Sequence, residues 1–90
     1  MPIEIVFRTQ GTDWDKFLST VRTRRGEIED SGCTGLWVHR NRSHPDEWMM
    51  VQRWPDKPTF DRFAEMKGKQ LDSEAGVRWT DVSTWEEVNV

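Results

Sequence analysis

The sequence predicts an α+β fold of the split βαβ type, with a four-stranded antiparallel sheet and two helices on one of its faces. Three observations lead to this prediction. Apolar side chains alternate with a period of two in short segments, they recur at helical spacing in two longer ones, and the segments follow in the order strand, helix, strand, strand, helix, strand. The length of 90 residues suits one domain over residues 1–90.

The first two elements are a strand and a helix. Residues 3–9 alternate like a half-buried strand. The run Thr12-Asp13-Trp14-Asp15 then has the form of a capping box, because a hydroxyl at the cap is followed three residues later by a carboxylate. The helix that follows is expected to end at Gly32. Its apolar positions at helical spacing are Trp14, Phe17, Leu18, Val21 and Ile28.

A β-hairpin follows, and its composition predicts how the protein assembles. Its strands are expected at about residues 33–41 and at residues 47–54, with a polar turn between them. Both faces of the hairpin are apolar, which is typical of a sheet covered on both sides. Two helices cover one side, so a face bearing Trp37, Met49 and Val51 would stay exposed. A second copy packed sheet to sheet would cover it, and we therefore expect a homodimer.

The second helix and the last strand complete the fold. Asp56 suits the helix cap and Pro58 its first turn. The apolar positions of this helix are Phe60, Phe63 and Ala64, and Leu71 would extend the series. Gly68 leaves the end of the helix open, residues 72–76 are expected to form a loop, and residues 82–88 are expected to form the last strand. The resulting order of elements is the ferredoxin-like arrangement.

Composition and charge exclude several classes of protein. A net charge of -3, with both signs mixed along the chain, gives no reason to expect nucleic acid or an anionic membrane as a partner. No run of apolar residues is long enough to span a membrane. Cys33 is the single cysteine, so we expect a small buried residue, no intrachain disulfide and a reducing compartment. Because Met1-Pro2-Ile3-Glu4-Ile5 lacks the features of a signal peptide, a cytoplasmic location is expected.

The end of the third predicted strand resembles a known family. The strand ends in Gln52-Arg53-Trp54, and the turn Pro55-Asp56-Lys57-Pro58 leads into a helix. This join resembles the antibiotic biosynthesis monooxygenase domain, in which the third strand typically ends in Glu-x-Trp. Trp54 matches that element, whereas Gln52 stands where the family has Glu. Residues 32–38 also resemble the family's small-residue entry into the second strand, so the resemblance spans nearly the whole chain.

The resemblance implies a dimeric α/β barrel with a ligand cleft between the helices and the sheet. Some members oxidise polycyclic aromatic or quinone-like substrates without metal or flavin. It therefore implies a cofactor-independent monooxygenase that binds a small aromatic or apolar molecule. Relatives that degrade haem use an axial histidine on the second helix, and this helix has none, so haem is not expected. A non-catalytic dimeric ligand-binding or accessory module, and a polyketide cyclase or isomerase, are alternatives that suit the same cleft.

The residues expected to bind a substrate come from the third strand and the second helix. The resemblance makes Trp54 a wall of the cleft, and alternation puts Met50 and Gln52 on the same face of the strand. Phe60 and Phe63 would close the opposite side. An aromatic pocket of this kind suits a flat apolar substrate. The same spacing also fits a plain hydrophobic core, and the sequence leaves both interpretations open.

His39 and Trp54 are the candidates for a role in catalysis. An ordinary histidine titrates near neutrality, so His39 could accept a proton from a phenol or enol, although a histidine near a hairpin end is commonly a surface residue. Arg8 could orient a carboxylate or phenolate, and alternation does not decide which face it occupies. His39 and His44, with Asp46 nearby, match no established spacing of metal ligands, so no metal is expected.

Overall fold

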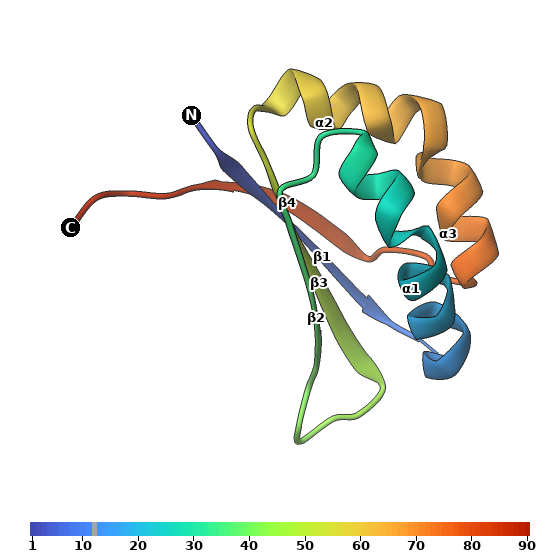
Figure 1. Ribbon diagram of the computed structural model, residues 1–90. Coiled ribbons are helices and arrows are strands. Elements are labelled where there is room, and N and C mark those ends of the chain that lie inside the picture. The colour runs from blue at the N-terminus through green and yellow to red at the C-terminus, as the bar shows by residue number, and fades with distance from the viewer. Residues whose placement is uncertain (12) are drawn as a thin grey trace.

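The computed structural model describes residues 1–11 and 13–90. Its elements are β1 Ile3–Gln10, α1 Trp14–Asp30, β2 Gly35–Arg40, β3 Glu47–Trp54, α2 Lys57–Phe63, a π-helical turn Ala64–Gly68, α3 Lys69–Ala75 and β4 Asp81–Glu86. The strands form one antiparallel sheet in the order β2-β3-β1-β4. Figure 1 shows the helices together on one face of this sheet, and the predicted α+β, ferredoxin-like fold is confirmed.

The two central strands show the predicted alternation in their burial. Along β1 and β3 every second side chain is buried, and the residues between them are more exposed. Ile5 lies opposite Gln52 on β3 and opposite Thr84 on β4. Residues that lie opposite each other point to the same face of a sheet. The register therefore puts the buried residues of both strands together under the helices.

The outer strands are shorter than predicted. β2 begins at Gly35 instead of residue 33, and just before it the backbone N–H of Thr34 donates to the carbonyl of Arg53 at 2.7 Å. β4 ends at Glu86 instead of residue 88. Residues 87–90 extend away from the body of the molecule (Figure 1).

Local interactions fix both ends of α1. Asp13 is its N-cap, and the Asp13 carboxylate accepts a hydrogen bond of 3.0 Å from the backbone N–H of Lys16. Thr12, the cap in the predicted capping box, lies outside the described residues. At the other end Ser31 is the C-cap, and Gly32 has φ 122°. Glycine adopts such a positive φ without steric strain, and α1 ends where the sequence predicted.

The prediction of a loop is wrong for residues 72–75, and Gly76 follows the helix in a turn. The chain passes from α2 through the π-helical turn into α3, which continues to Ala75. Gly68 keeps helical backbone angles, and Gly76, with φ 67°, ends the helix in the left-handed conformation. Leu71 and Ala75 pack against the core. This packing outweighs the low helix propensity of glycine, which amounts to about 1 kcal/mol.

Aromatic side chains fill the space between the sheet and the helices. Phe17 of α1 stacks on Trp48 of β3, with ring centroids 5.3 Å apart and an interplanar angle of 13°. The ring of Trp54 is completely buried and contacts Phe60 and Phe63 of α2, at centroid distances of 5.6 and 5.0 Å. Large aromatic contacts supply much of the buried apolar area that a chain of this length needs.

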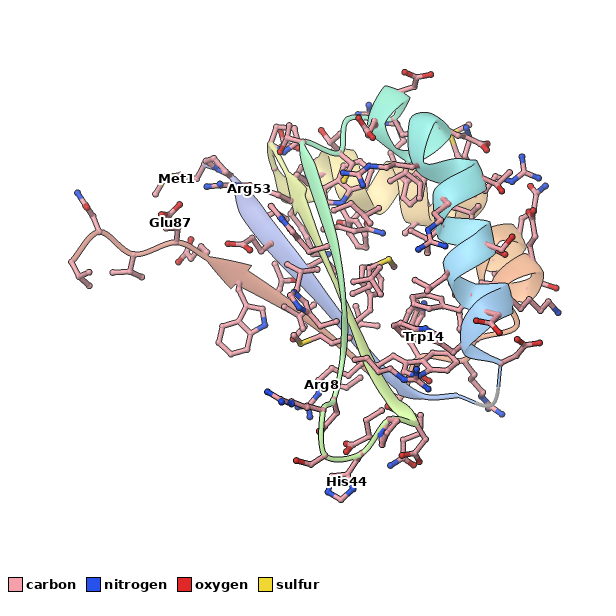
Figure 2. All side chains as sticks on the ribbon, turned by 60° about the horizontal axis from the view of Figure 1, so that its bottom comes forward. Met1, Arg8, Trp14, His44, Arg53 and Glu87 are labelled. Atoms are coloured by element: carbon pink, nitrogen blue, oxygen red, sulfur yellow. The ribbon has the colours of Figure 1, made fainter. Side chains whose placement is uncertain are left out.

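The other face of the sheet, here called the open face, carries an apolar strip. Trp37, Val51 and Val6 lie side by side across β2, β3 and β1. None of the described helices covers this face, and Trp37 remains 46% exposed. Figure 2 shows Arg53 and Glu87 on the same side, where their side chains form a salt bridge of 2.8 Å. The open face is thus apolar in its middle and charged at its border.

Candidate functional site

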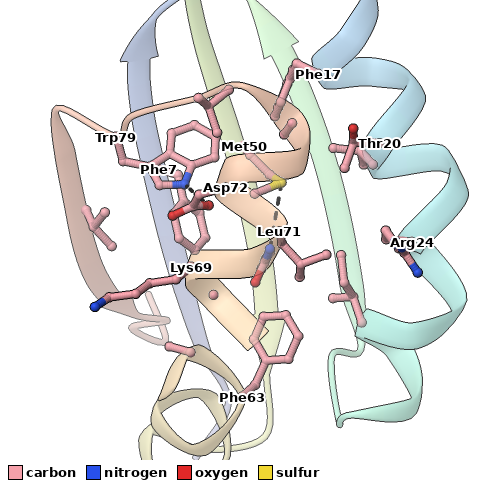
Figure 3. A pocket seen from close by; sticks show the side chains of 18 of the residues that line it. Phe7, Phe17, Thr20, Arg24, Met50, Phe63, Lys69, Leu71, Asp72 and Trp79 are labelled. Carbon is pink, nitrogen blue, oxygen red and sulfur yellow. Dashed lines mark hydrogen bonds between the residues drawn. The ribbon is translucent and has the colours of Figure 1, made fainter. Parts of the chain in front are cut away.

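A cavity of about 340 Å³ lies between the helices and the sheet (Figure 3). The sheet forms its floor, α1 forms one wall, and the segment from α2 to α3 forms the opposite wall. The main apolar side chains around it are Phe7, Met50, Phe17, Ile28, Phe63 and Leu71. Exposed residues, among them Lys69 and Val82, also line it, so the cavity reaches the surface. Its volume falls within the range of roughly 300–1,000 Å³ that is usual for small-molecule sites.

Gln52 brings a buried amide to the floor of the cavity. Its Oε1 accepts a hydrogen bond of 3.0 Å from Nε1 of Trp54, and its Nε2 lies 3.7 Å from Sδ of Met50. Because an indole N–H can only donate, the bond from Trp54 fixes which way round the amide lies. A thioether sulfur is a weak acceptor. The amide nitrogen of Gln52 therefore keeps the capacity to donate to an oxygen atom of a ligand.

Asp72 brings a carboxylate to the wall of the same cavity. Its Oδ1 accepts a hydrogen bond of 2.9 Å from Nε1 of Trp79, drawn as a dashed line in Figure 3. Burial raises the pKa of the Asp72 carboxyl above its ordinary value, and the bond from Trp79 opposes this increase. The ring of Trp79 contacts Phe7 and Phe17, at centroid distances of 5.2 and 5.8 Å. Trp79 is therefore held by packing and in turn holds the carboxylate.

Arg24 lies at the rim of the cavity, where two carboxylates bind it. Its Nη2 is 3.0 Å from Oε2 of Glu74, and its Nη1 is 3.5 Å from Oε2 of Glu27. The hydrogen bond to Glu74 is the main cause that raises the pKa of Arg24. Glu27 also pairs with Lys67 at 2.9 Å, and this partner lowers the pKa of Glu27. The guanidinium group thus joins α1 to α3 beside the cavity.

Most residues predicted to bind a substrate lie around this cavity. Its lining includes Met50, Gln52, Phe60 and Phe63. Trp54 is not among the described lining residues, since its buried ring stands behind Gln52 and the two phenylalanines. Gln52, Phe60 and Phe63, which the ring of Trp54 contacts, form the wall that was predicted for Trp54.

Arg8 and His39 lie on the open face, away from this cavity. Alternation along β2 turns His39 in the opposite direction from Val38, whose partner on β3 is the cavity residue Met50. Arg8 and His39 both lie opposite Met49 and line a second, more polar depression. The sheet therefore separates His39 from Trp54, the two residues that the sequence suggested for catalysis.

In residues 1–11 and 13–90, no group of three or more His, Cys, Asp or Glu side chains is placed to hold a metal ion. The same part of the chain contains no helix that is both long and apolar enough to cross a membrane. His39 and His44 are both exposed, and His44 lies in the turn between β2 and β3.

The sequence of residues 3–70 matches the family model for antibiotic biosynthesis monooxygenases. The chain belongs to the antibiotic biosynthesis monooxygenase family. The family of the predicted resemblance is thereby confirmed. No curated protein matches the chain.

Solved structures share the fold of this family member. A candidate antibiotic biosynthesis monooxygenase from Bordetella bronchiseptica has a TM-score of 0.82 at 17% identity, over 98% of each chain. SnoaB, a cofactor-independent oxygenase from Streptomyces nogalater, has a TM-score of 0.81 at 15% identity, over 99% of this chain and 95% of SnoaB. A candidate monooxygenase of the same kind from Caulobacter crescentus has a TM-score of 0.78 at 9% identity, over 98% of this chain and 91% of the other. At these identities the likeness establishes the fold.

Asp72 and Trp79 line the cavity of this family member, and neither was predicted from the sequence as a site residue. In a regular α-helix, positions 60 and 72 are roughly 3.3 turns apart and so about a third of a turn out of line. The π-helical turn contains one residue more than an α-helical turn, and this corrects the offset. Asp72 and Phe60 therefore line the same cavity. The spacing of the cavity residues could have indicated Asp72, since Phe60, Ala64 and Gly68 are four residues apart and Asp72 continues that series.

Proposed function

We propose that this protein is a homodimer that binds a flat aromatic metabolite in the cavity between its helices and its sheet, and oxidises it with molecular oxygen without a cofactor. The observation that carries the proposal is an aromatic-walled cavity with two placed polar groups, the Gln52 amide and the Asp72 carboxylate. Apolar walls with a few convergent polar groups are typical of small-molecule sites. SnoaB, which shares this fold, is a cofactor-independent oxygenase.

In the proposed reaction the substrate itself supplies the electrons. An anthrone-like substrate first loses a proton and becomes an enolate, which then transfers electrons to oxygen. Overall, a CH₂ group and O₂ become a carbonyl group and water, so the four electrons that reduce oxygen all come from the substrate. The protein contributes a water-excluding site, a fixed orientation of the ring and one proton acceptor.

Gln52 has a defined part in this proposal. The free N–H of its amide would donate to the oxygen on which the negative charge of the enolate develops, and such placed donors lower the barrier. Trp54 acts through Gln52, because the bond from the indole keeps the amide nitrogen turned away from Trp54. Phe60 and Phe63 would hold the plane of the substrate against this donor.

The homodimer in this proposal rests on the open face. Monomeric proteins rarely expose a contiguous apolar surface of this kind. A two-fold, sheet-to-sheet contact would bury Val6, Trp37, Met49 and Val51 of both copies at once. The charged residues around the strip would then form the rim of the interface.

The test of the proposed site compares two substitutions in the same π-helical turn. Ala64 lines the cavity, so Ala64→Phe would fill it, whereas Met66 is 72% exposed and Met66→Phe would leave the cavity unchanged. Binding of anthrone is followed by Trp fluorescence, which Trp79 in the wall should report, and turnover is followed by oxygen uptake. We expect saturable binding and uptake in the wild type and in Met66→Phe, and loss of both in Ala64→Phe. Equal binding by Ala64→Phe would place the ligand elsewhere.

A non-catalytic ligand-binding module is the second candidate, and the composition of the cavity favours it. The described residues around the cavity include no His, Cys or Tyr, and the proton acceptor among them is a carboxylate. A carboxylate is a weaker base than a histidine. Saturable binding of anthrone without any oxygen uptake would support this second function and exclude oxygenation of that substrate.

A further inference from the structure

The carboxylate of Asp72 is only partly used by the fold. Oδ1 accepts the hydrogen bond from Trp79, and no other hydrogen bond to this side chain occurs among the described residues. A carboxylate offers about four lone-pair sites on its two oxygens. At least one oxygen therefore keeps its accepting capacity while it lies in the wall of the cavity.

The charge of Asp72 also has no partner in the described part of the chain. No salt bridge there joins it to Arg24 or Lys69, two cations that line the same cavity, and Arg24 is bound to Glu74 and Glu27. A partly buried carboxylate without a counter-ion is unfavourable unless hydrogen bonds compensate it. The Trp79 contact alone does not explain the charge, because the amide oxygen of an asparagine would accept that bond equally well. The oxygen of Asp72 that does not bind Trp79 therefore remains available to a donor that enters the cavity.

We infer that Asp72 is the hydrogen-bond acceptor that makes the cavity selective for aromatic ligands bearing a hydroxyl group. Trp79 is a positioning residue, which fixes the carboxylate and leaves its second oxygen for the ligand. The inference rests on the proposed function, because it names a group that strengthens the binding of a ligand in this cavity. A hydroxyl donates to the carboxylate, while a methyl ether on the same ring system has no O–H to donate.

The experiment compares 1-naphthol with 1-methoxynaphthalene, whose rings are identical. Dissociation constants are measured by Trp fluorescence, corrected for ligand absorbance, on the wild type, on Asp72→Asn and on Glu65→Gln. Glu65 is an exposed acid on the π-helical turn and serves as the matched control. We expect the wild type and Glu65→Gln to bind 1-naphthol at least about tenfold more tightly than 1-methoxynaphthalene, which is the scale of a hydrogen bond to a charged group. In Asp72→Asn the affinity for the naphthol should fall to that for the ether, while the affinity for the ether stays the same.

The outcomes distinguish a failure of the inference about Asp72 from a failure of the proposed function. If both compounds bind the wild type equally and Ala64→Phe removes both, the cavity is a ligand site and the inference about Asp72 is overturned alone. If neither compound nor anthrone binds, the proposed function fails and the inference falls with it. A full preference for the naphthol in Asp72→Asn would also overturn the inference. The comparison within the wild type needs no variant, so equal binding of the two compounds there overturns the inference even where a substitution prevents folding.

Discussion

The indole Nε1 of Trp54 donates a hydrogen bond of 3.0 Å to Oε1 of Gln52, two residues earlier on the same strand, and both side chains are buried. Side chains two apart on a strand point to the same face, which allows the long amide to reach the ring. The pair ties the end of β3 to the floor of the cavity. It also links the strand-ending tryptophan to the proposed site without any contact with a ligand.

This pair predicts a coupling in stability between the two residues. Gln52→Leu leaves the buried N–H of Trp54 without its acceptor and should lower the free energy of unfolding by roughly 1–3 kcal/mol. Trp54→Phe should be destabilising too, and the double variant should cost less than the sum of the two. Urea denaturation of all four proteins measures the coupling, expected at about 0.5–3 kcal/mol. Additive effects would mean that the bond contributes nothing to stability.

The proposed dimer makes a prediction about Trp37. Trp37→Lys puts a charge at the middle of the open face, beside Val51, where a sheet-to-sheet contact would have to bury it at high cost. Sedimentation should give a mass of two chains for the wild type and of one chain for Trp37→Lys. Met66→Lys changes an exposed apolar residue on the helix side and should remain a dimer. A monomeric wild type at micromolar concentration would exclude the proposed assembly.

The two inner strands and the start of α2 could be predicted because local chemistry decides them. The alternation of β1, the bounds of β3 at Glu47 and Trp54, and the cap at Asp56 all follow from neighbouring residues. The end of the second helical segment could not be predicted, because two glycines compete for it. Gly68 is held in helical geometry by packing on either side, and Gly76 ends the segment. Tertiary contacts decide between them, and a single sequence does not show these contacts.

The same limit applies to the cavity. Alternation placed Met50 and Gln52 on one face because both lie on a regular strand. Asp72 could not be found in that way, since its direction depends on the extra residue in the π-helical turn. His39 shows the converse case: its residue type suggested a proton acceptor, while its direction follows from pairing opposite Met49. Residue type indicates what a side chain can do, and the register decides where it acts.

Cys33 is predicted to react slowly with thiol reagents while the protein is folded. Burial raises the pKa of its thiol, and Sγ donates a hydrogen bond of 3.0 Å to the carbonyl of Gly35. The thiolate is the reactive form, so a raised pKa and low access both slow the reaction. Labelling with a disulfide reagent should be slow in buffer and fast and stoichiometric in denaturant. Rapid labelling in buffer would show that the region around the start of β2 opens readily.

Asp72 leads to a prediction about pH. Because burial raises the pKa of this carboxyl in the folded state above its ordinary value of 3.8, the folded protein binds the proton more tightly than the unfolded chain does. The Asp72 contribution to stability is therefore most favourable below that ordinary value, and it is lost progressively as the pH rises through the folded pKa.

Asp72→Asn removes this titration and keeps an amide oxygen for the bond from Trp79. The difference in unfolding free energy, variant minus wild type, should therefore increase as the pH rises from about 4, with the variant gaining relative to the wild type. Urea denaturation of both proteins at a series of pH values from 4 to 8 measures this difference, in which the titrations of the other groups cancel. Saturating 1-naphthol should reduce the difference at neutral pH, because its hydroxyl would compensate the wild-type carboxylate and leave less for asparagine to gain. A difference that decreases with rising pH would mean that the folded state stabilises the Asp72 carboxylate, the opposite of the effect expected from burial.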